Sequence, residues 1–174
     1  MLAVRNTDAG DAAAERIRAT GAAGRVSVER LDLASQESVR EFAAGLDGPL
    51  DLLVNNAGVM APPKHRTTVD GFELQFATNH LGHFALTGLL LPHLLEAEAP
   101  RVTTVASIAH HRSDGAVAEG NPASGYDPQT SYGRSKLANL LFALELQRRA
   151  TASGSSLTST AAHPGVSGTN LFGS

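Results

Sequence analysis

The stretch from residue 50 to residue 58 reads Leu50-Asp51-Leu52-Leu53-Val54-Asn55-Asn56-Ala57-Gly58, a short apolar run that ends in a polar turn with a glycine. Four other short runs of this kind occupy residues 2–4, 25–31, 102–106 and 157–162. Each is too short, and too rich in consecutive apolar or β-branched residues, to favour helix. Together with residues 50–54 they predict five strands of a buried parallel sheet.

Longer helical patterns separate these strands, at residues 8–20, 35–46, 69–98 and 131–150. Ser35 and Ser131 are well placed as helix N-caps. Regular alternation of strand and helix is typical of an α/β fold built on a parallel sheet. A chain of 174 residues suits a single domain, which can bury roughly 70% of its unfolded surface.

The composition excludes several classes of protein. Lys and Arg number 14 against 17 Asp and Glu, so no basic field is present to hold nucleic acid or an anionic membrane. Cysteine is absent, which excludes disulfides and thiolate metal sites. The most apolar stretch, residues 84–95, is shorter than the ~20 residues that a membrane span needs, and the first residues do not read as a signal peptide. We therefore expect a soluble, cytoplasmic protein.

One long irregular stretch, residues 107–130, follows the strand at 102–106. It holds three glycines, two prolines and the pair His110 and His111. Loops of this length in compact domains are usually functional, and open α/β sheets bind ligands at the carboxyl ends of their strands. This loop is the first candidate for part of a site.

Tyr132 and Lys136 open the helix that follows this loop. Side chains four positions apart on a helix project from one face. We expect the ammonium of Lys136 to lower the pKa of the Tyr132 phenol, which would make Tyr132 a general acid or base near neutral pH. The alternative is a packed tyrosine with a solvated lysine one turn later.

Two other strand ends carry polar groups. Ser107 follows residues 102–106, and Asn55 begins the turn after residues 50–54. Because the carboxyl ends of parallel strands meet at one edge of the sheet, these side chains should converge near Tyr132.

These residues together resemble the short-chain dehydrogenase/reductase family: Asn-Asn-Ala-Gly at 55–58, Ser107, Tyr-x-x-x-Lys at 132–136, and Pro164-Gly165 followed by Thr169. Residues 78–84 (Thr-Asn-His-Leu-Gly-His-Phe) and 131–139 are similar to the branch of retinol dehydrogenases, the WW-domain oxidoreductase and protochlorophyllide reductases. The resemblance runs from Leu2 to Thr169. It implies a Rossmann-like doubly wound parallel sheet, with residues 1–174 forming one NAD(P)-binding domain.

The resemblance implies a catalytic tetrad. Tyr132 would be the acid and base, and Lys136 would lower its pKa and bind the nicotinamide ribose. Ser107 would orient the substrate oxygen, and Asn79 would hold a water that links Lys136 to solvent. Hydroxyl and amide groups suit these roles because they both donate and accept hydrogen bonds.

The resemblance also implies a set of cofactor contacts: Arg5, Asn6, Asp32, Leu33, Asn55, Ala57, Gly58, Tyr132, Lys136, Pro164, Gly165, Val166 and Thr169. Gly58 and Gly165 would allow close approach of the backbone to the ligand. Arg5 stands at a strand end where NAD-preferring members carry an acid. Its guanidinium would match a 2′-phosphate, which favours NADP(H) over NAD(H).

The sequence departs from the family at both ends. Nothing before Leu2 reads as the family's first strand or its glycine-rich phosphate loop, and the substrate-closing segment is missing after Ser174. We expect an incomplete domain, or a reading frame started too late. In the family's strand order the missing strand is central, so two of the remaining strands should lack a neighbour.

The partners follow from the same comparison. We expect an oxidoreductase acting on a small carbonyl or alcohol, with lipophilic aldehydes, ketones, sterols and retinoids all fitting the branch. The apolar helices at 69–98 and 131–150 predict burial on both sides. The resemblance implies that these two helices form a subunit contact, and so a homodimer of the full-length protein; the alternative is a monomer with an added covering segment. His80 with His83, and His110 with His111, lack a third ligand and predict no metal site.

Two other classes stay open. One is a catalytically impaired or inactive nucleotide-binding or interaction protein on the same fold, favoured by the missing phosphate loop. The other is an extended-family epimerase or dehydratase, against which the Asn-Asn-Ala-Gly run argues.

Overall fold

The computed structural model describes residues 1–117 and 125–165. All five predicted strands are present, within three residues of their predicted ends: β1 (Leu2–Val4), β2 (Val28–Arg30), β3 (Leu52–Asn55), β4 (Arg101–Val105) and β5 (Thr158–Ala162). β2 is the main difference, because only the last part of residues 25–31 pairs with a neighbour. The α/β fold is therefore confirmed.

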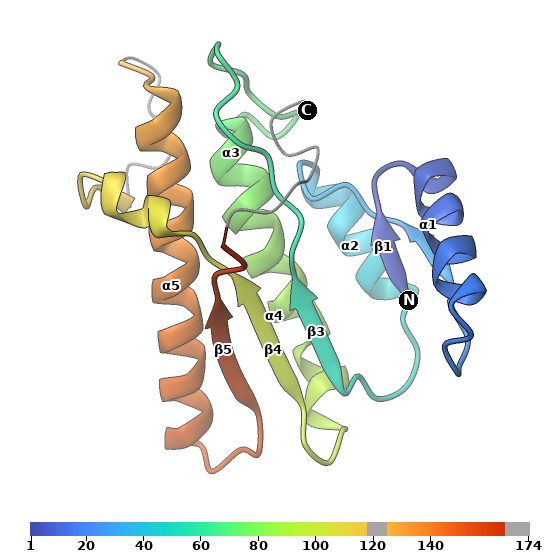
Figure 1. Cartoon of the computed structure of the whole chain (residues 1–174). Coiled ribbons are helices and arrows are strands. Elements are labelled where there is room, and N and C mark those ends of the chain that lie inside the picture. Colours follow the sequence, from blue (N-terminus) through green and yellow to red (C-terminus); the bar gives the residue numbers. More distant parts are fainter. Residues whose placement is uncertain (118–124, 166–174) are drawn as a thin grey trace.

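The strands form two parallel sheets (Figure 1). β1 pairs with β2, with Leu2 opposite Val28, and β3, β4 and β5 pair in that order. Among the described residues β1 and β3 share no partner strand. β1 and β3 each lie at an edge of their own sheet, and the expectation that a central strand is missing between them stays a prediction.

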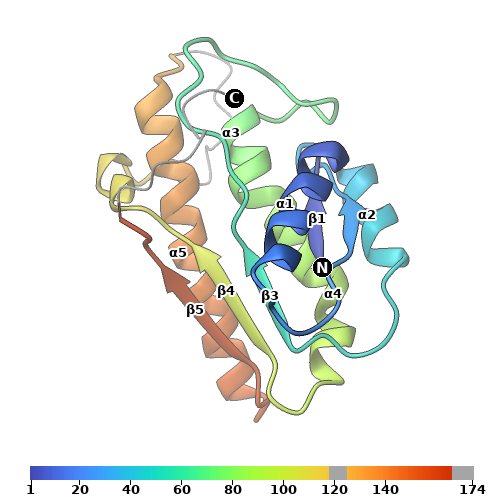
Figure 2. The ribbon, with the colours of Figure 1, turned by 45° about the vertical axis from the view of Figure 1, so that its right-hand side comes forward.

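Helices lie on both faces of the strands. In Figure 1, α2 (Gln36–Ala44), α4 (Gly82–Leu95) and α5 (Pro128–Ala152) lie behind the strands, and α1 (Thr7–Ala19) lies to the right of β1. Figure 2 shows the same separation from the side. In Figure 1 no described helix covers the front of β3. The side chains of Leu52 and Val54 in β3 are 53% and 51% exposed.

The structure tests the two predicted helix N-caps, Ser35 and Ser131. Ser35 caps α2 as predicted, because its Oγ accepts a hydrogen bond from Ser38 N at 3.2 Å. The prediction for Ser131 was wrong. α5 begins at Pro128, and Asp127 caps it by accepting from Thr130 N at 2.7 Å. Proline is favoured at a first helical position, so Asp127-Pro128 was the stronger signal.

The helix predicted at residues 69–98 is shorter and interrupted. It starts as α3 (Leu74–Phe76), passes through the π-helical turn η1 (Ala77–Leu81) and continues as α4. Glu73 is its N-cap and accepts from Phe76 N at 2.7 Å. π-helical turns within α-helices often occur at functional sites.

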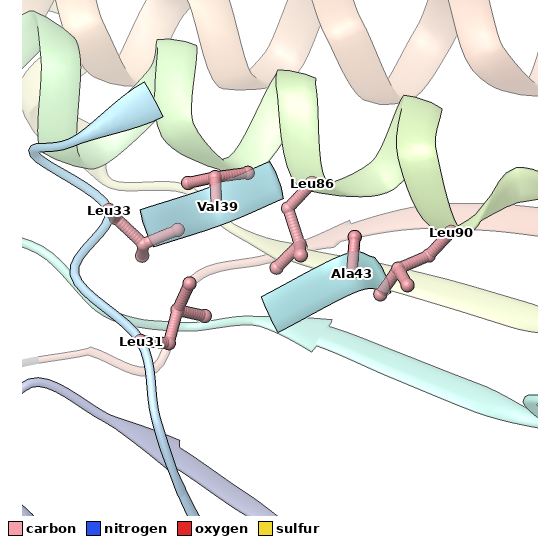
Figure 3. Close-up of a cluster of buried hydrophobic side chains, with 6 residues drawn as sticks. All are labelled: Leu31, Leu33, Val39, Ala43, Leu86 and Leu90. Carbon is pink, nitrogen blue, oxygen red and sulfur yellow. The ribbon is translucent and has the colours of Figure 1, made fainter. Parts of the chain in front are cut away.

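A cluster of buried hydrophobic side chains lies between α2, α4 and the segment after β2 (Figure 3). It consists of Leu31, Leu33, Val39, Ala43, Leu86 and Leu90, which point toward one another from the two helices and the segment after β2. A fully buried Leu or Val contributes about 1.5–3 kcal/mol. A second cluster (Leu94, Val102, Ala150 and Leu157) joins α4 and α5 to β4.

The outer faces of α4 and α5 carry exposed apolar side chains. Phe84, Leu141 and Leu144 are exposed in the single chain, and their predicted burial, which needs a second subunit or a covering segment, stays a prediction. The second apolar face is therefore left uncovered within the described residues.

Candidate active site

Tyr132 and Lys136 lie together near the start of α5, as the spacing predicted. Both side chains are buried. The Lys136 Nζ atom lies 5.7 Å from the centroid of the Tyr132 ring and donates to Val105 O, at the end of β4, at 3.0 Å. The pair is therefore fixed against the carboxyl edge of the three-stranded sheet.

Ser107 joins this pair because the loop after β4 folds back onto α5. The Ser107 Oγ caps the 3-10 helix η2 (Ile108–Arg112) by accepting from Ala109 N at 3.2 Å, and Ser107 lies near enough to the Tyr132 phenol to lower its pKa. Residues 108–112 are therefore helical, where an irregular loop was predicted. A Cβ at Gly133 would lie 2.8 Å from Ala109 O, so only glycine permits this approach.

The electrostatics of Tyr132 differ from the expectation. Burial raises the pKa of its phenol above 10, and the hydrogen bond with Ser107 opposes that rise in part. Burial lowers the pKa of Lys136 to about 8. The predicted lowering of the Tyr132 pKa was therefore wrong for the chain alone, because the loss of hydration on burial is the largest cause.

Asn79 lies in η1 with its amide bound to protein groups. Its Oδ1 accepts from Val59 N at 2.8 Å, and its Nδ2 donates to Val59 O and Ser135 Oγ, both at 3.0 Å. A Cβ at Gly58 would stand 3.0 Å from the same Oδ1. Asn79 therefore fixes the segment after Gly58, and its predicted role in holding a water stays a prediction.

The turn after β3 is held from α4. His83 Nε2 donates to Ala57 O at 2.9 Å, since a carbonyl can only accept. Burial lowers the pKa of His83 to about 4, so the ring is neutral at pH 7. Asn55 is buried, and its Nδ2 donates to Thr87 Oγ1 at 3.1 Å.

Asn55 also carries an unsatisfied group. Its Oδ1 is buried and has no hydrogen-bond partner among the described residues. A buried acceptor without a donor is costly. A donor from a ligand, or from chain outside these residues, would satisfy it.

The residues predicted to contact the adenosine half have different local roles. Arg5 is exposed at the end of β1, and Asn6 caps α1 by accepting from Ala9 N at 3.1 Å. Asp32 accepts from Ala34 N at 3.0 Å. The Leu33 side chain belongs to the core, and its backbone touches Gly82, where a Cβ would stand 2.3 Å from Leu33 O. Any cofactor contact of Leu33 is therefore limited to its backbone.

The end of the described chain carries two predicted residues. Pro164 and Gly165 follow β5 at the edge that holds Ser107, and Gly165 has φ 75°, which favours glycine. Val166 and Thr169 lie outside the described residues.

Several residues of the site were missed by the sequence prediction. Ser135 accepts from Asn79 and donates to Tyr132 O at 2.8 Å. Asn139 donates to Val105 O at 3.4 Å, beside Lys136, and accepts from His80 Nδ1 at 3.2 Å. Their positions on the Tyr132 helix, at i+3 and i+7, were the available signal.

The histidines predicted to lack a metal have protein contacts. His80 and His83 bind Asn139 and Ala57, and His110 Nδ1 donates to Ser107 O at 2.8 Å. No group of three or more potential ligands gathers within residues 1–117 and 125–165.

A hollow of about 250 Å³ adjoins Ser107. It lies between η2, α5 and the end of β5, and its lining is mostly apolar: Ala106, Ser107, Ile108, His110, Leu140, Ala161, Ala162 and His163.

No described helix has the length and apolar character to cross a lipid bilayer.

The comparisons with known proteins agree with this geometry. The family described as short chain dehydrogenase matches residues 1–174. Retinol dehydrogenase 13 of Homo sapiens is 44% identical over 98% of the chain and 52% of its own length. The chain therefore spans about half the length of the curated relatives it matches.

Two solved structures are similar. An uncharacterized protein from Mycobacterium paratuberculosis superposes with a TM-score of 0.84 at 54% identity, over 97% of this chain and 59% of its own. RhlG of Pseudomonas aeruginosa, solved as an NADP active-site complex, has a TM-score of 0.66 at 27% identity, over 90% and 58%. The chain belongs to the short-chain dehydrogenase family, in the branch of the retinol dehydrogenases.

Proposed function

We propose that this chain is the cofactor-binding and catalytic core of an NADP(H)-dependent oxidoreductase, which transfers a hydride between nicotinamide and a carbonyl or alcohol carbon. The observation that carries the proposal is the juxtaposition of Tyr132, Lys136 and Ser107 at the carboxyl edge of the sheet. Edges of this kind bind ligands in open α/β sheets.

A bound nicotinamide dinucleotide supplies the hydride in reduction and accepts it in oxidation. In reduction, Tyr132 donates its phenolic proton to the carbonyl oxygen, and Ser107 holds that oxygen by a hydrogen bond. Lys136 places a positive charge near the phenolate that forms. In oxidation Tyr132 takes the proton back.

Three features of the chain fit a dinucleotide. Asn55 offers a buried acceptor that lacks a partner among the described residues. Gly165 has the positive φ that lets backbone approach a ligand closely. Arg5 is exposed at the end of β1, where its guanidinium suits a 2′-phosphate, which supports NADP(H) over NAD(H). The similar structure of RhlG contains NADP.

We propose a lipophilic carbonyl or alcohol as substrate. The mostly apolar hollow beside Ser107 would take such a molecule, and the curated relative in human is a retinol dehydrogenase.

The uncovered apolar residues Phe84, Leu141 and Leu144 support a homodimer through α4 and α5. Cytoplasmic location stays a proposal from the sequence.

The second candidate is a nucleotide-binding or interaction protein without turnover. It is favoured by the lack of pairing between β1 and β3 among the described residues, the two strands that the family's first strand would join. Under this alternative the same residues would bind cofactor but transfer no hydride.

The test compares wild-type protein, expressed from its complete genomic reading frame, with Tyr132→Phe. Oxidation of NADPH is followed with retinaldehyde and with shorter aldehydes. Loss of the proton donor should reduce turnover by ~10² to 10⁴ while NADPH binding persists. A wild-type protein that binds NADPH without turnover would support the second candidate, and near-normal turnover of Tyr132→Phe would overturn the role of Tyr132.

A further inference from the structure

The segment that follows the Asn-Asn-Ala-Gly turn is held in a strained conformation. Ala61 has φ 49°, the one positive φ among the described residues other than glycine. A Cβ disfavours this left-handed region, so a non-glycine residue stays there only where its surroundings hold it. Ala61 lies three positions after Gly58 and two after Val59.

The side chain of Gln75 stabilises this conformation of Ala61. Its side chain is fully buried in α3, with 0% of its surface exposed. Its Oε1 accepts from Ala61 N at 2.7 Å. The hydrogen bond satisfies the backbone N–H of Ala61.

The same amide reaches the start of α5. Gln75 Nε2 donates to Tyr126 Oη and to Pro128 O, both at 3.1 Å. Tyr126 Oη in turn donates to Pro62 O at 2.9 Å, which closes the network on the residue after Ala61. Both hydrogens of the amide and its oxygen are therefore used by two different segments.

Glu73 fixes where Gln75 lies. It is fully buried, and its two carboxylate oxygens accept from Gln75 N at 2.9 Å and Phe76 N at 2.7 Å. The start of α3 therefore cannot turn or fray without losing these two hydrogen bonds. The Gln75 amide is held in a single place by its own backbone.

Each segment that meets at Gln75 carries a residue of the candidate site. The loop carries Gly58 and Val59, the helix carries Asn79 one turn later in η1, and α5 carries Tyr132 four residues after Pro128. A second link, from Asn79 to Val59, joins two of the same segments. The network thus connects the proposed cofactor turn to the proposed acid and base.

We propose that Gln75 is a positioning residue, which holds the strained segment at Ala61 and the start of α5 in register so that the turn at Gly58 and Tyr132 meet the same cofactor. The expected effect on NADPH binding rests on the proposed function. The link between the Ala61 segment and the start of α5 rests on the hydrogen bonds of Gln75. Gln75 touches neither of the reacting groups.

A simpler account makes Gln75 a stabilising residue only. Gln147, near the far end of α5, serves as the matched control, because its Oε1 also accepts a backbone hydrogen bond from another segment, Ser159 N at 2.8 Å. Gln147→Met and Gln75→Met make the same chemical change. Both should lower thermal stability, but only the second should disturb the site.

The experiment uses protein from the complete reading frame and measures the dissociation constant of NADPH and amide hydrogen exchange. Gln75→Met should weaken NADPH by about three- to tenfold, the cost of one or two buried hydrogen bonds. Exchange should rise in residues 59–62 and 126–132. Gln147→Met should change neither quantity by more than about twofold.

Ala61→Gly provides the rescue. Glycine adopts the left-handed conformation without strain, so the segment needs Gln75 less. Gln75→Met should then weaken NADPH by under about twofold when combined with Ala61→Gly. An equal loss in both backgrounds would overturn the proposal.

The outcomes separate this inference from the proposed function. If the protein binds no NADPH, the proposed function falls, and the exchange data alone decide the coupling. Faster exchange confined to residues 59–62 and 126–132 in Gln75→Met supports it. Exchange that rises uniformly along the chain in Gln75→Met refutes it.

Discussion

Gly133 of α5 lies against the backbone of η2, so closely that a Cβ at Gly133 would stand 2.8 Å from Ala109 O and 2.9 Å from Ser113 N. Both neighbours are backbone atoms, which cannot turn aside as a flexible side chain can. This contact sets how closely the segment after Ser107 approaches Tyr132.

Gly133→Ala should therefore separate Ser107 from Tyr132. Overpacking costs about 1–3 kcal/mol, offset by up to about 1 kcal/mol of helix propensity. The measurement is the free energy of unfolding together with carbonyl reduction. The control is Gly88→Ala in α4, where nothing lies within 4 Å of an added Cβ, and which should be neutral or stabilising. Equal behaviour of the two variants would contradict this reading of Gly133.

Lys136→Met tests the charge beside the phenol. The change removes the ammonium 5.7 Å from the Tyr132 ring. Turnover should fall, and NADPH should bind more weakly if the proposed contact between Lys136 and the nicotinamide ribose is lost. The residual activity should move to higher pH, since the phenolate loses its neighbouring positive charge. A pH–rate profile checks this, and an unshifted profile would show that Lys136 does not act on the acid and base.

His83 should make stability depend on pH. Its pKa is lowered from 6.5 to about 4 by burial, the dominant cause. The unfolded chain therefore takes up a proton first as pH falls, so stability is lost between about pH 6.5 and pH 4, by roughly 3 kcal/mol. His83→Gln can still donate toward Ala57 O but does not titrate. Denaturant unfolding from pH 4 to pH 8 should show a flatter curve for the variant, and parallel curves would refute the assignment.

Arg5→Asp tests cofactor choice. If Arg5 binds the 2′-phosphate, its loss removes a charge-assisted contact worth roughly 1.5–3 kcal/mol, or about tenfold or more in NADPH affinity. NADH, which lacks that phosphate, should bind no more weakly. Arg16→Asp, which alters the net charge equally from an exposed position on α1, is the control. Unchanged NADPH affinity in Arg5→Asp would show that the guanidinium is only solvated.

The two strand edges predict what lies before Leu2 in the genome. β1 and β3 run parallel to their partners but do not pair with each other, and Leu52 and Val54 are exposed beside them. We expect in-frame upstream DNA to encode an apolar strand and a Gly-x-x-x-Gly-x-Gly turn about 20 residues before Arg5. Stop codons directly upstream would refute this expectation.

The fold was largely predictable because its signals are local. Five short apolar runs, the Ser35 cap and the spacing of Tyr132 and Lys136 depend on residues within a few positions of one another. The family resemblance rested on the same short motifs. These determined the order of the elements, the face shared by Tyr132 and Lys136, and the strand ends at Ser107 and Asn55.

Other features depend on residues far apart in the chain. Leu33 was assigned to the cofactor site, but Gly82 brings α4 against its carbonyl and makes its side chain part of the core. The pKa of Tyr132 rises because packing removes water, which no spacing along α5 reveals. The contacts of Gln75 with Ala61 and Tyr126 span 14 and 51 positions.

The sequence by itself determined the α/β fold, the order of its elements and the helical face that Tyr132 and Lys136 share, since hydrophobic period and side-chain spacing are properties of neighbouring residues. Only the tertiary structure decided which polar groups Asn79, His83 and Gln75 bind, and how close Ser107 comes to Tyr132. Those contacts join separate segments, and their strength depends on burial, which exists only once the chain has folded.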